Sequence, residues 1–245
     1  MEFNIFRFDQ VTSTNDLAAD LSYGHGSIVT ASAQSAGRGQ RGNKWESRRG
    51  ENLMFSLVVC PTHIRVDEQF SLSMITALAV VDALRTAGVE ALIKWPNDIY
   101  VGQRKICGIL IEHSFSGPEL SRTIIGVGIN VAQSEFEPTA ARAVSLVQLG
   151  VTGVDVEAML GLFCSSFAAL YELSFAPLAL QNLGERYMAN LYRGEGFFPY
   201  RDTASTEHFA ACIAAIDPAS GLLTLEDRSH EQRNYHFKEV EFLID

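Results

Sequence analysis

A closely spaced series of apolar segments between residues 91 and 131 most constrains how this chain can fold. The segments are rich in β-branched and aromatic residues, and turns that contain Gly102 and Gly117 separate them. They are Ala91–Trp95, Ile99–Val101, Lys105–Ser114 and Arg122–Val131. Because short apolar runs with turns between them are typical of neighbouring strands, this stretch predicts a strand-rich block.

Further strands and helices are predicted on both sides of this block. Strands are predicted at residues 27–33 and Asn52–Val59, and helices at Gln69–Ala87, Asp155–Leu173 and Phe175–Leu191. Ser13 begins a short helix, and Asp16 follows three residues later in a pattern close to a capping box. The helix at Gln69–Ala87 is apolar over most of its length, so we expect it to be buried.

The chain changes character after about Tyr192. Short alternating segments follow at His208–Asp217, Leu222–Glu226 and Asn234–Glu239. This tail of about 50 residues is too small to bury a large core of its own. The whole sequence therefore predicts an α+β protein with a small β domain at its C-terminal end.

Composition limits the classes of partner. The 29 acidic and 19 basic residues give a formal net charge of −10, which argues against general affinity for nucleic acid or an anionic membrane. The N-terminus has no basic-then-apolar signal pattern, and Met74–Leu84, taken as the most apolar run, is shorter than the ~20 residues that span a bilayer. The cysteines and histidines show no metal-ligand spacing. Four cysteines could form two disulfides, but Cys60 and Cys107 lie in apolar strand-like runs, so we expect reduced core thiols in a cytoplasmic protein.

The most unusual segment is a basic, glycine-rich loop, Gly37–Trp45, extended by Arg48 and Arg49. Its guanidinium and backbone N–H groups suit a phosphate or a carboxylate, and its glycines allow a close approach to a ligand. Trp45 could stack on a heterocycle. A solvated surface loop explains the same pattern, so both interpretations stay open here.

Two further segments carry groups suited to chemistry. Asp98 ends the segment Lys94-Trp95-Pro96-Asn97-Asp98 and could ligate Mg²⁺ that a nucleotide carries, or it could cap its own turn. Lys105 begins an apolar strand that contains Gly108, and a glycine there leaves room for a ligand. A lysine at a hairpin end is the alternative. Glu112 is predicted to be an exposed strand end.

Two more patterns are weaker. Gly126 and Gly128 lie two residues apart in a strand, so both face the same side, which suits a wall against a ligand. Ser13, Thr14 and Asn15 offer hydroxyl and amide groups at a helix start, either as a plain cap or to bind a small polar ligand.

In their order and spacing these segments resemble the biotin–protein ligase family, also called biotin–[acetyl-CoA-carboxylase] ligases. The matching motifs are Ser13-Thr14-Asn15, Gln34-x-x-Gly37-Arg38-Gly39-x-Arg41-Gly42-x-Lys44-Trp45, Glu51-Asn52-Leu53, Lys94-Trp95-Pro96-Asn97-Asp98, Lys105-x-x-Gly108-Ile109-Leu110-x-Glu112 and Gly126-x-Gly128-Ile129-Asn130. Each motif is weak by itself, whereas the set over roughly residues 5–190 is highly specific.

The resemblance implies a fold and a domain division. A mixed β-sheet flanked by helices, the class II synthetase-like catalytic fold of biotin and lipoate ligases, would span residues 1–191. A small β-barrel of the Src-homology-3 type would span residues 192–245, where the resemblance is looser.

The resemblance also implies a reaction in two steps. The carboxylate of biotin attacks the α-phosphate of ATP, which gives biotinyl-5′-AMP and pyrophosphate. A lysine of a biotin carboxyl carrier protein, from acetyl-CoA carboxylase or a related biotin-dependent carboxylase, then attacks this mixed anhydride and releases AMP. The expected substrates are ATP with Mg²⁺, biotin and the carrier protein.

Residue roles follow from the matched motifs. Lys105 would bridge the biotin carboxylate and the α-phosphate, and Asp98 would hold Mg²⁺ on the phosphates. The loop residues Arg38, Arg41 and Lys44 would offset the repulsion between the two anions. The residues expected to bind biotin are Ser13, Thr14, Asn15, Gln34, Arg38, Gly39, Gln40, Lys105 and Gly108. The residues expected to contact ATP are Arg41, Lys44, Trp45, Asn97, Lys105 and Asn130.

Two departures and several alternatives qualify this interpretation. Gln40 and Asn43 stand where several well-known members carry basic residues. With fewer positive charges over the intermediate, we expect weaker retention of the adenylate. Only twelve residues precede Ser13, so we expect a monofunctional ligase without the DNA-binding domain of bifunctional members. Nucleic acid and membrane are not expected partners, and homodimer formation is left open.

Three alternatives stay open. A lipoate or octanoate ligase or transferase of the same fold is the nearest, and the KWPND and GRGxRG motifs favour biotin over it. A non-enzymatic binder of anions or nucleic acid through the basic loop belongs to a different class of protein. A ligase-like biotin sensor without transfer activity is the third.

Overall fold

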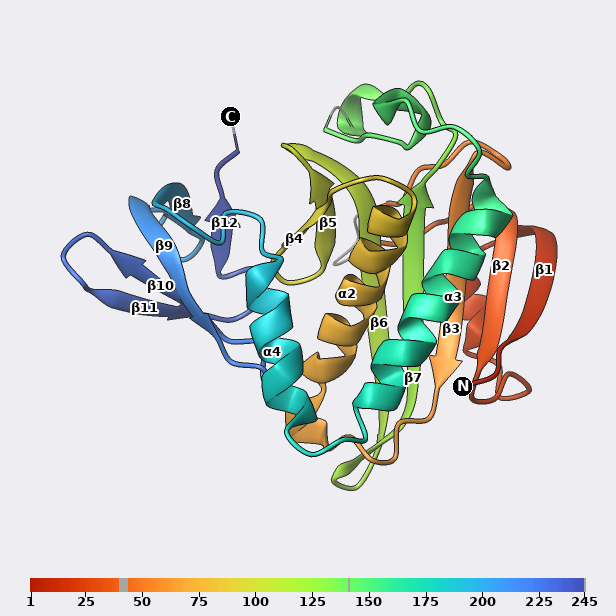
Figure 1. The fold of residues 1–245 in the computed structure, drawn as a ribbon, viewed down its shortest axis with the longest axis horizontal. Helices are drawn as coiled ribbons and strands as arrows, with labels where there is room; N and C mark the ends of the chain where they lie inside the picture. The colour runs from red at the N-terminus through yellow and green to blue at the C-terminus, as the bar shows by residue number, and fades with distance from the viewer. Residues whose placement is uncertain (40–43, 141, 245) are drawn as a thin grey trace.

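The computed structural model describes residues 1–39, 44–140 and 142–244. Within these residues the larger sheet has seven strands in the order β1-β2-β3-β7-β6-β5-β4 (Figure 1). Their bounds are β1 Asn4–Val11, β2 Ser27–Gln34, β3 Asn52–Val59, β4 Leu92–Lys94, β5 Asp98–Val101, β6 Arg104–Ser116 and β7 Glu119–Asn130. β1 and β2 are parallel and the other neighbours are antiparallel, so the sheet is mixed, as the resemblance implied.

Two long helices, α2 (Phe70–Thr86) and α3 (Val156–Leu173), cover one face of this sheet (Figure 1). Ile125 and Ile129 of β7 belong to the main hydrophobic core together with residues of these helices. Because side chains alternate along a strand, Gly126 and Gly128 point to the opposite face. That face is left without bulky side chains at its centre, close to the short helix α1 (Thr14–Ala18).

Helix α3 corrects one expectation. It has 18 residues and a mean hydropathy of 1.4, which makes it long and apolar enough to cross a membrane by length and composition alone. The choice of Met74–Leu84 as the most apolar run was therefore wrong. In the structure α3 buries Phe163, Phe167 and Tyr171 and packs against α2 and β3.

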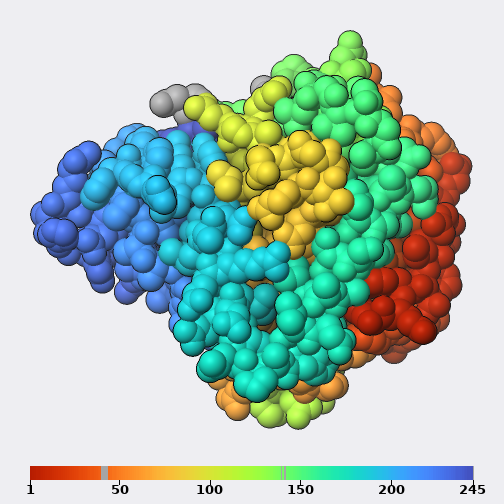
Figure 2. Space-filling view, in the orientation of Figure 1, coloured from red at the N-terminus to blue at the C-terminus, as the bar shows by residue number. Residues whose placement is uncertain are grey.

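The C-terminal residues form a second sheet with the strand order β11-β10-β9-β8-β12. Its strands are β8 Phe198–Asp202, β9 His208–Ile216, β10 Leu223–Asp227, β11 Gln232–Tyr235 and β12 Val240–Phe242. In the space-filling view this sheet is a lobe beside α4 (Ala179–Ala189) (Figure 2). Trp95 Nε1 donates to the carbonyl oxygen of Gly221 at 3.0 Å, and the Phe237 ring packs against Phe70 and Trp95. The two sheets therefore share one hydrophobic core.

Most predicted strands and helices are confirmed, with ends displaced by a few residues. β1 and β8 were not predicted. The predicted strand at Asn234–Glu239 is wrong, because β11 ends at Tyr235 and a turn precedes β12. The expected capping box is also wrong, since Ser13 occupies the N-cap position of α1 without a side-chain cap hydrogen bond. All four cysteines are free thiols, as predicted.

Candidate active site

A cavity of about 1010 Å³ opens on the glycine-bearing face of the larger sheet. Its walls come from the start of α1, the basic loop, the turn after β4, the strands β6 and β7, and the C-terminal sheet. Most residues that the sequence predicted for the site line it: Ser13, Thr14, Asn15, Gln34, Arg38, Gly39, Lys44, Trp45, Asn97, Asp98, Lys105 and Gly108. The fold thus brings segments that are far apart in the sequence into one place.

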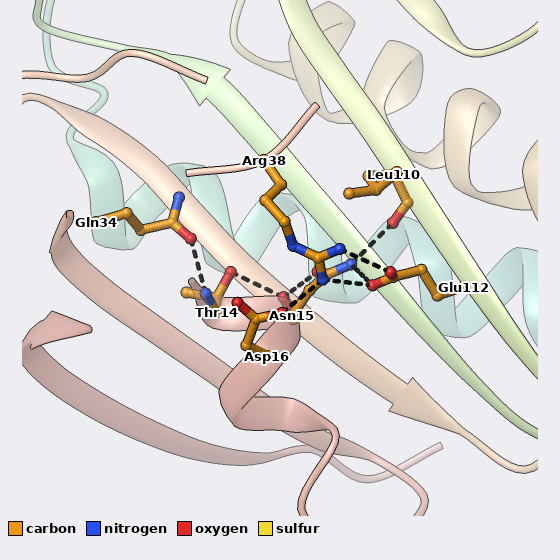
Figure 3. A network of polar contacts seen from close by, with 8 residues as sticks. Thr14, Asn15, Asp16, Gln34, Arg38, Leu110 and Glu112 are labelled. Atoms are coloured by element: carbon orange, nitrogen blue, oxygen red, sulfur yellow. Dashed lines mark hydrogen bonds and ion pairs between the residues drawn. The ribbon is translucent and has the colours of Figure 1, made fainter. Parts of the chain in front are cut away.

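One end of the cavity is a network of polar side chains (Figure 3). Gln34 Oε1 accepts from the backbone N–H of Thr14 at 2.7 Å. Ser56 Oγ lies 2.8 Å from Thr14 Oγ1 and 2.6 Å from Asn15 Oδ1. Thr14, Asn15 and Ser56 are buried, so these contacts fix their hydroxyl and amide groups in defined orientations. This end offers both donors and acceptors of hydrogen bonds.

Arg38 is held in this network by two carboxylates (Figure 3). Its guanidinium donates to both oxygens of Glu112, at 3.0 and 3.1 Å, and lies 2.7 Å from Asp16 Oδ1. The hydrogen bonds to Glu112 raise the pKa of Arg38 further above its ordinary value. Glu112 also accepts from Asn15 Nδ2 at 2.7 Å. The prediction that Glu112 is a plain exposed strand end is therefore wrong.

This pairing bears on the role expected for Arg38. Two carboxylates already balance its positive charge. An arginine held in this way is an oriented donor of hydrogen bonds. Its bidentate contact with Glu112 fixes the plane of the guanidinium.

The charged centre of the cavity lies on β5 and β6. Lys105 Nζ lies 2.6 Å from Asp98 Oδ1. Asn97 is buried and donates from Nδ2 to the carbonyl oxygen of Ile109 at 2.9 Å, which fixes the turn before Asp98. Lys94 lines the same cavity, 4.9 Å from the Phe242 ring centroid, and burial lowers its pKa. Two lysine side chains therefore face the cavity here.

Glycines form the wall between these two regions. A Cβ atom at Gly126 would lie 2.2 Å from Asn15 Oδ1. A Cβ at Gly128 would lie 2.4 Å from Trp45 Cε2, and one at Gly108 would lie 2.9 Å from Trp45 Cζ3. The Asn15 amide and the Trp45 indole therefore pack against this wall. The sequence suggested that a ligand would take this space, whereas in the structure these two side chains take it. Trp45 Nε1 is buried and has no hydrogen-bond partner among the residues that the structure describes, which leaves a donor at this wall.

Of the predicted site residues that the structure describes, one does not line the cavity. Asn130 is not among the lining residues, and its Nδ2 donates to the carbonyl oxygen of Val144 at 3.1 Å, so it joins β7 to the following loop. Gln40 and Arg41 lie outside the described residues, as does Asn43.

Sequence reasoning missed several residues that the structure brings to the site. Besides Glu112, they are Asp16, Ser56, Lys94, Arg142, Arg201 and Lys238. Lys94 could have been found, because it belongs to the predicted turn segment. Arg201 and Lys238 carry no local signal, because only the packing of the C-terminal sheet against the larger sheet brings them there.

The fit of the cavity to Mg²⁺ follows from its donors. Within the described part of the chain, no group of three or more His, Cys, Asp and Glu side chains could hold a metal ion. A carboxylate such as Asp98 beside ammonium groups fits Mg²⁺ that arrives on the phosphates of a nucleotide, since Mg²⁺ is commonly held by one or two carboxylates and by phosphate oxygens. When bound there, the ion would supply positive charge to those phosphates.

The fold has known counterparts. The biotin protein ligase from Aquifex aeolicus in complex with biotin and ATP superposes with a TM-score of 0.82 at 21% identity, over 99% of both chains. The biotin protein ligase from Leishmania major in complex with biotinyl-5-AMP gives a TM-score of 0.65 at 22% identity, over 95% of this chain and 98% of that one. The chain therefore has the fold of a biotin protein ligase, including the C-terminal sheet.

Sequence comparison places the chain in a family. A family profile described as "Biotin/lipoate A/B protein ligase family" matches residues 6–130. A biotin--[acetyl-CoA-carboxylase] ligase from Paracoccus denitrificans is 39% identical over 181 residues, which are 68% of this chain and 74% of that protein. The bifunctional ligase/repressor BirA from Bacillus spizizenii is 36% identical over 129 residues, which are 51% of this chain and only 39% of that protein. The chain belongs to the biotin/lipoate A/B protein ligase family.

Proposed function

We propose that this protein is a biotin–protein ligase, which uses ATP to join biotin to one lysine of a carrier protein. A carboxylate oxygen of biotin would attack the α-phosphorus of ATP, so that pyrophosphate leaves and biotinyl-5′-AMP forms. The amine of the carrier lysine would then attack the acyl carbon, so that an amide forms and AMP leaves. Similarity to the named ligase of Paracoccus denitrificans supports this activity.

The polar end of the cavity is the observation that favours biotin over lipoate. The ureido ring of biotin has two N–H donors and a carbonyl acceptor, whereas the dithiolane ring of lipoate has neither. Thr14, Asn15, Gln34 and Arg38 present oriented donors and acceptors there. A site built to hydrogen-bond a ligand rejects an analogue that leaves its buried polar groups unpaired.

The charged centre supports the adenylation step. The biotin carboxylate and the α-phosphate are both anions, and they must meet before a bond can form. The Lys105 ammonium is a compact cation with three donors, so one group can contact both anions and reduce their repulsion. Asp98, 2.6 Å away, holds that ammonium at the cavity. Asn97 fixes the turn that carries Asp98.

The partner follows from the same proposal. A biotin carboxyl carrier protein would present its lysine at the mouth of the cavity, since the similar Paracoccus protein is named for acetyl-CoA carboxylase. Four free thiols fit a reducing compartment such as the cytoplasm. A lack of nucleic-acid binding remains a prediction, and homodimer formation remains open.

Biotin-dependent exchange of label from pyrophosphate into ATP tests the proposal. The purified chain is assayed with Mg²⁺ and with biotin, lipoate or octanoate as the acid. We expect exchange with biotin and at most about a hundredth of that rate with the other two acids. Exchange with lipoate instead of biotin would keep the fold and reject the substrate. If the folded protein shows no exchange with any acid, the proposed enzymatic activity is wrong.

A further inference from the structure

Lysine is distributed unevenly in this chain. The sequence contains 15 arginines and only four lysines, which are Lys44, Lys94, Lys105 and Lys238. All four line the cavity of the candidate active site, whereas of the 14 arginines that the structure describes only Arg38, Arg142 and Arg201 do. Because these are all the lysines in the sequence, every other cationic side chain of the protein is a guanidinium.

The two side chains differ in the chemistry that matters at this site. A lysine amine is neutral in about one molecule in a thousand near pH 7.4, and that fraction carries a lone pair that can attack an activated acyl group. A guanidinium stays protonated at any physiological pH and has no acceptor lone pair. An acyl adenylate therefore acylates lysine and spares arginine.

We propose that this placement of lysine confines self-acylation to the cavity and leaves the outer surface of the enzyme inert to its own intermediate. The inference rests on the proposed function, since it needs an acyl adenylate. In the side reaction a lysine Nζ attacks the acyl carbon, a C–N bond forms, and the bond from carbon to the phosphate oxygen breaks. AMP leaves with the electron pair, and the ammonium proton goes to water.

The four cavity lysines are unequal as acceptors. Lys105 is paired with Asp98 at 2.6 Å, which directs its Nζ at the carboxylate. Lys94 lies between two aromatic rings, 4.9 Å from the Phe242 centroid and 5.7 Å from the Tyr100 centroid. Lys44 is exposed. Lys44 is therefore the site at which we expect most self-acylation when no carrier is present.

The arginines on the outer surface include positions where an amine would be accessible. Arg7 and Arg65 have side chains 53% and 70% exposed, and Arg228 lies over the Phe197 ring on the C-terminal lobe. None of the three lines the cavity. Replacing them by lysine keeps the charge and adds three acceptor amines on different sides of the molecule.

The test compares the wild-type chain with the triple variant Arg7→Lys, Arg65→Lys, Arg228→Lys. A matched control carries glutamine at the same three positions. Each protein is incubated with biotin and MgATP without a carrier, and peptide mass spectrometry reads the occupancy at every lysine. The N-terminal amine serves as an internal reference. Pyrophosphate exchange and a thermal melt confirm equal activity and folding.

We expect the wild-type and glutamine proteins to carry label chiefly at Lys44, and the lysine variant to gain label at all three substituted positions. Total label should rise at least about threefold. If exchange is normal and the three substituted positions stay unlabelled, the inference is wrong and the scarcity of lysine reflects composition alone. If biotin-dependent exchange is absent from the wild-type protein, the proposed function is wrong, and the inference that rests on it is wrong as well.

Discussion

Lys105 Nζ lies 2.6 Å from Asp98 Oδ1, and the two side chains come from neighbouring antiparallel strands, β6 and β5. The side chains are 32% and 28% exposed, so water screens this pair only in part. The contact sets where the ammonium stands in the cavity. It also explains why a lysine at the start of a strand and an aspartate at a turn, seven residues apart, act as one unit.

Replacing Lys105 by Ala should lower kcat for biotin-dependent pyrophosphate exchange by about 10²- to 10³-fold, because the cation that joins two anions is lost. The free energy of unfolding of this variant should differ little from that of the wild-type protein. Arg104→Ala is the matched control, since Arg104 is an exposed neighbour that does not line the cavity. Near-normal exchange in Lys105→Ala, or an equal loss in Arg104→Ala, would contradict the role given to Lys105.

Glu112 should act as a positioning residue for the polar end of the cavity. Glu112→Gln removes one charge from a side chain that holds both Arg38 and Asn15. The Arg38 and Glu112 side chains are 42% and 40% exposed, so water weakens their contact. We therefore expect KM for biotin to rise only about three- to tenfold, with kcat and KM for ATP nearly unchanged.

Two further variants sharpen the test of Glu112. Glu112→Asp should restore part of the biotin affinity, because it keeps the charge. Glu157→Gln removes a carboxylate that pairs with Arg7 on the outer surface and should leave all constants unchanged. A fall in kcat alone, or an equal effect of Glu157→Gln, would speak against a positioning role.

Gly126→Ala should weaken biotin binding strongly. The added Cβ would lie 2.2 Å from Asn15 Oδ1, so Asn15 must leave its contacts with Ser56 and Glu112. Titration calorimetry should show at least about a tenfold loss of biotin affinity. Gly161→Ala is the control, because it has open space in helix α3 and should stabilise the fold by about 0.5–1 kcal/mol. Unchanged affinity in Gly126→Ala would reject the packing account of this glycine.

His113 should make the fold sensitive to acid. Burial lowers its pKa from 6.5 to about 4, and its Nδ1 lies 2.9 Å from Thr123 Oγ1. The unfolded chain therefore binds more protons between about pH 4 and 6.5, so the free energy of unfolding falls as the pH drops through this window.

Denaturant titrations at several pH values measure this dependence. As the pH drops through that window, the free energy of unfolding should fall by about 1–3 kcal/mol less in His113→Gln than in the wild-type protein. His25 and His63, whose pKa values burial also lowers, remain in the variant, so part of the acid sensitivity should persist. An identical pH dependence for both proteins would show that His113 titrates normally in the fold.

Local sequence patterns predicted much of this structure for physical reasons. β3 at Asn52–Val59 was predicted with the right ends, because six of its eight residues are apolar, and all eight are buried. Asp98 was found because it stands at a turn between two apolar segments, and Lys105 because it begins an apolar strand. β1 was not predicted, because this edge strand at Asn4–Val11 keeps polar and exposed side chains and lacks the usual apolar run.

Other features depend on contacts between distant segments, which a single sequence does not reveal. Glu112 looked like a solvated strand end until β6 was placed beside α1 and the basic loop. Asn130 belongs to a matched motif, yet it bonds Val144 instead of lining the cavity. Arg201 and Lys238 reach the site only because the C-terminal sheet docks near Trp95.

The most direct test of the central claim is the mass of a biotin carboxyl carrier domain after incubation with the purified enzyme, MgATP and an equal mixture of biotin and lipoate. Peptide mapping then identifies the modified residue. We predict one biotinyl group on a single carrier lysine, no lipoyl group, and no modification when Lys105→Ala replaces the wild-type enzyme. A lipoylated carrier, or an unmodified carrier beside an active reference ligase, would contradict the account.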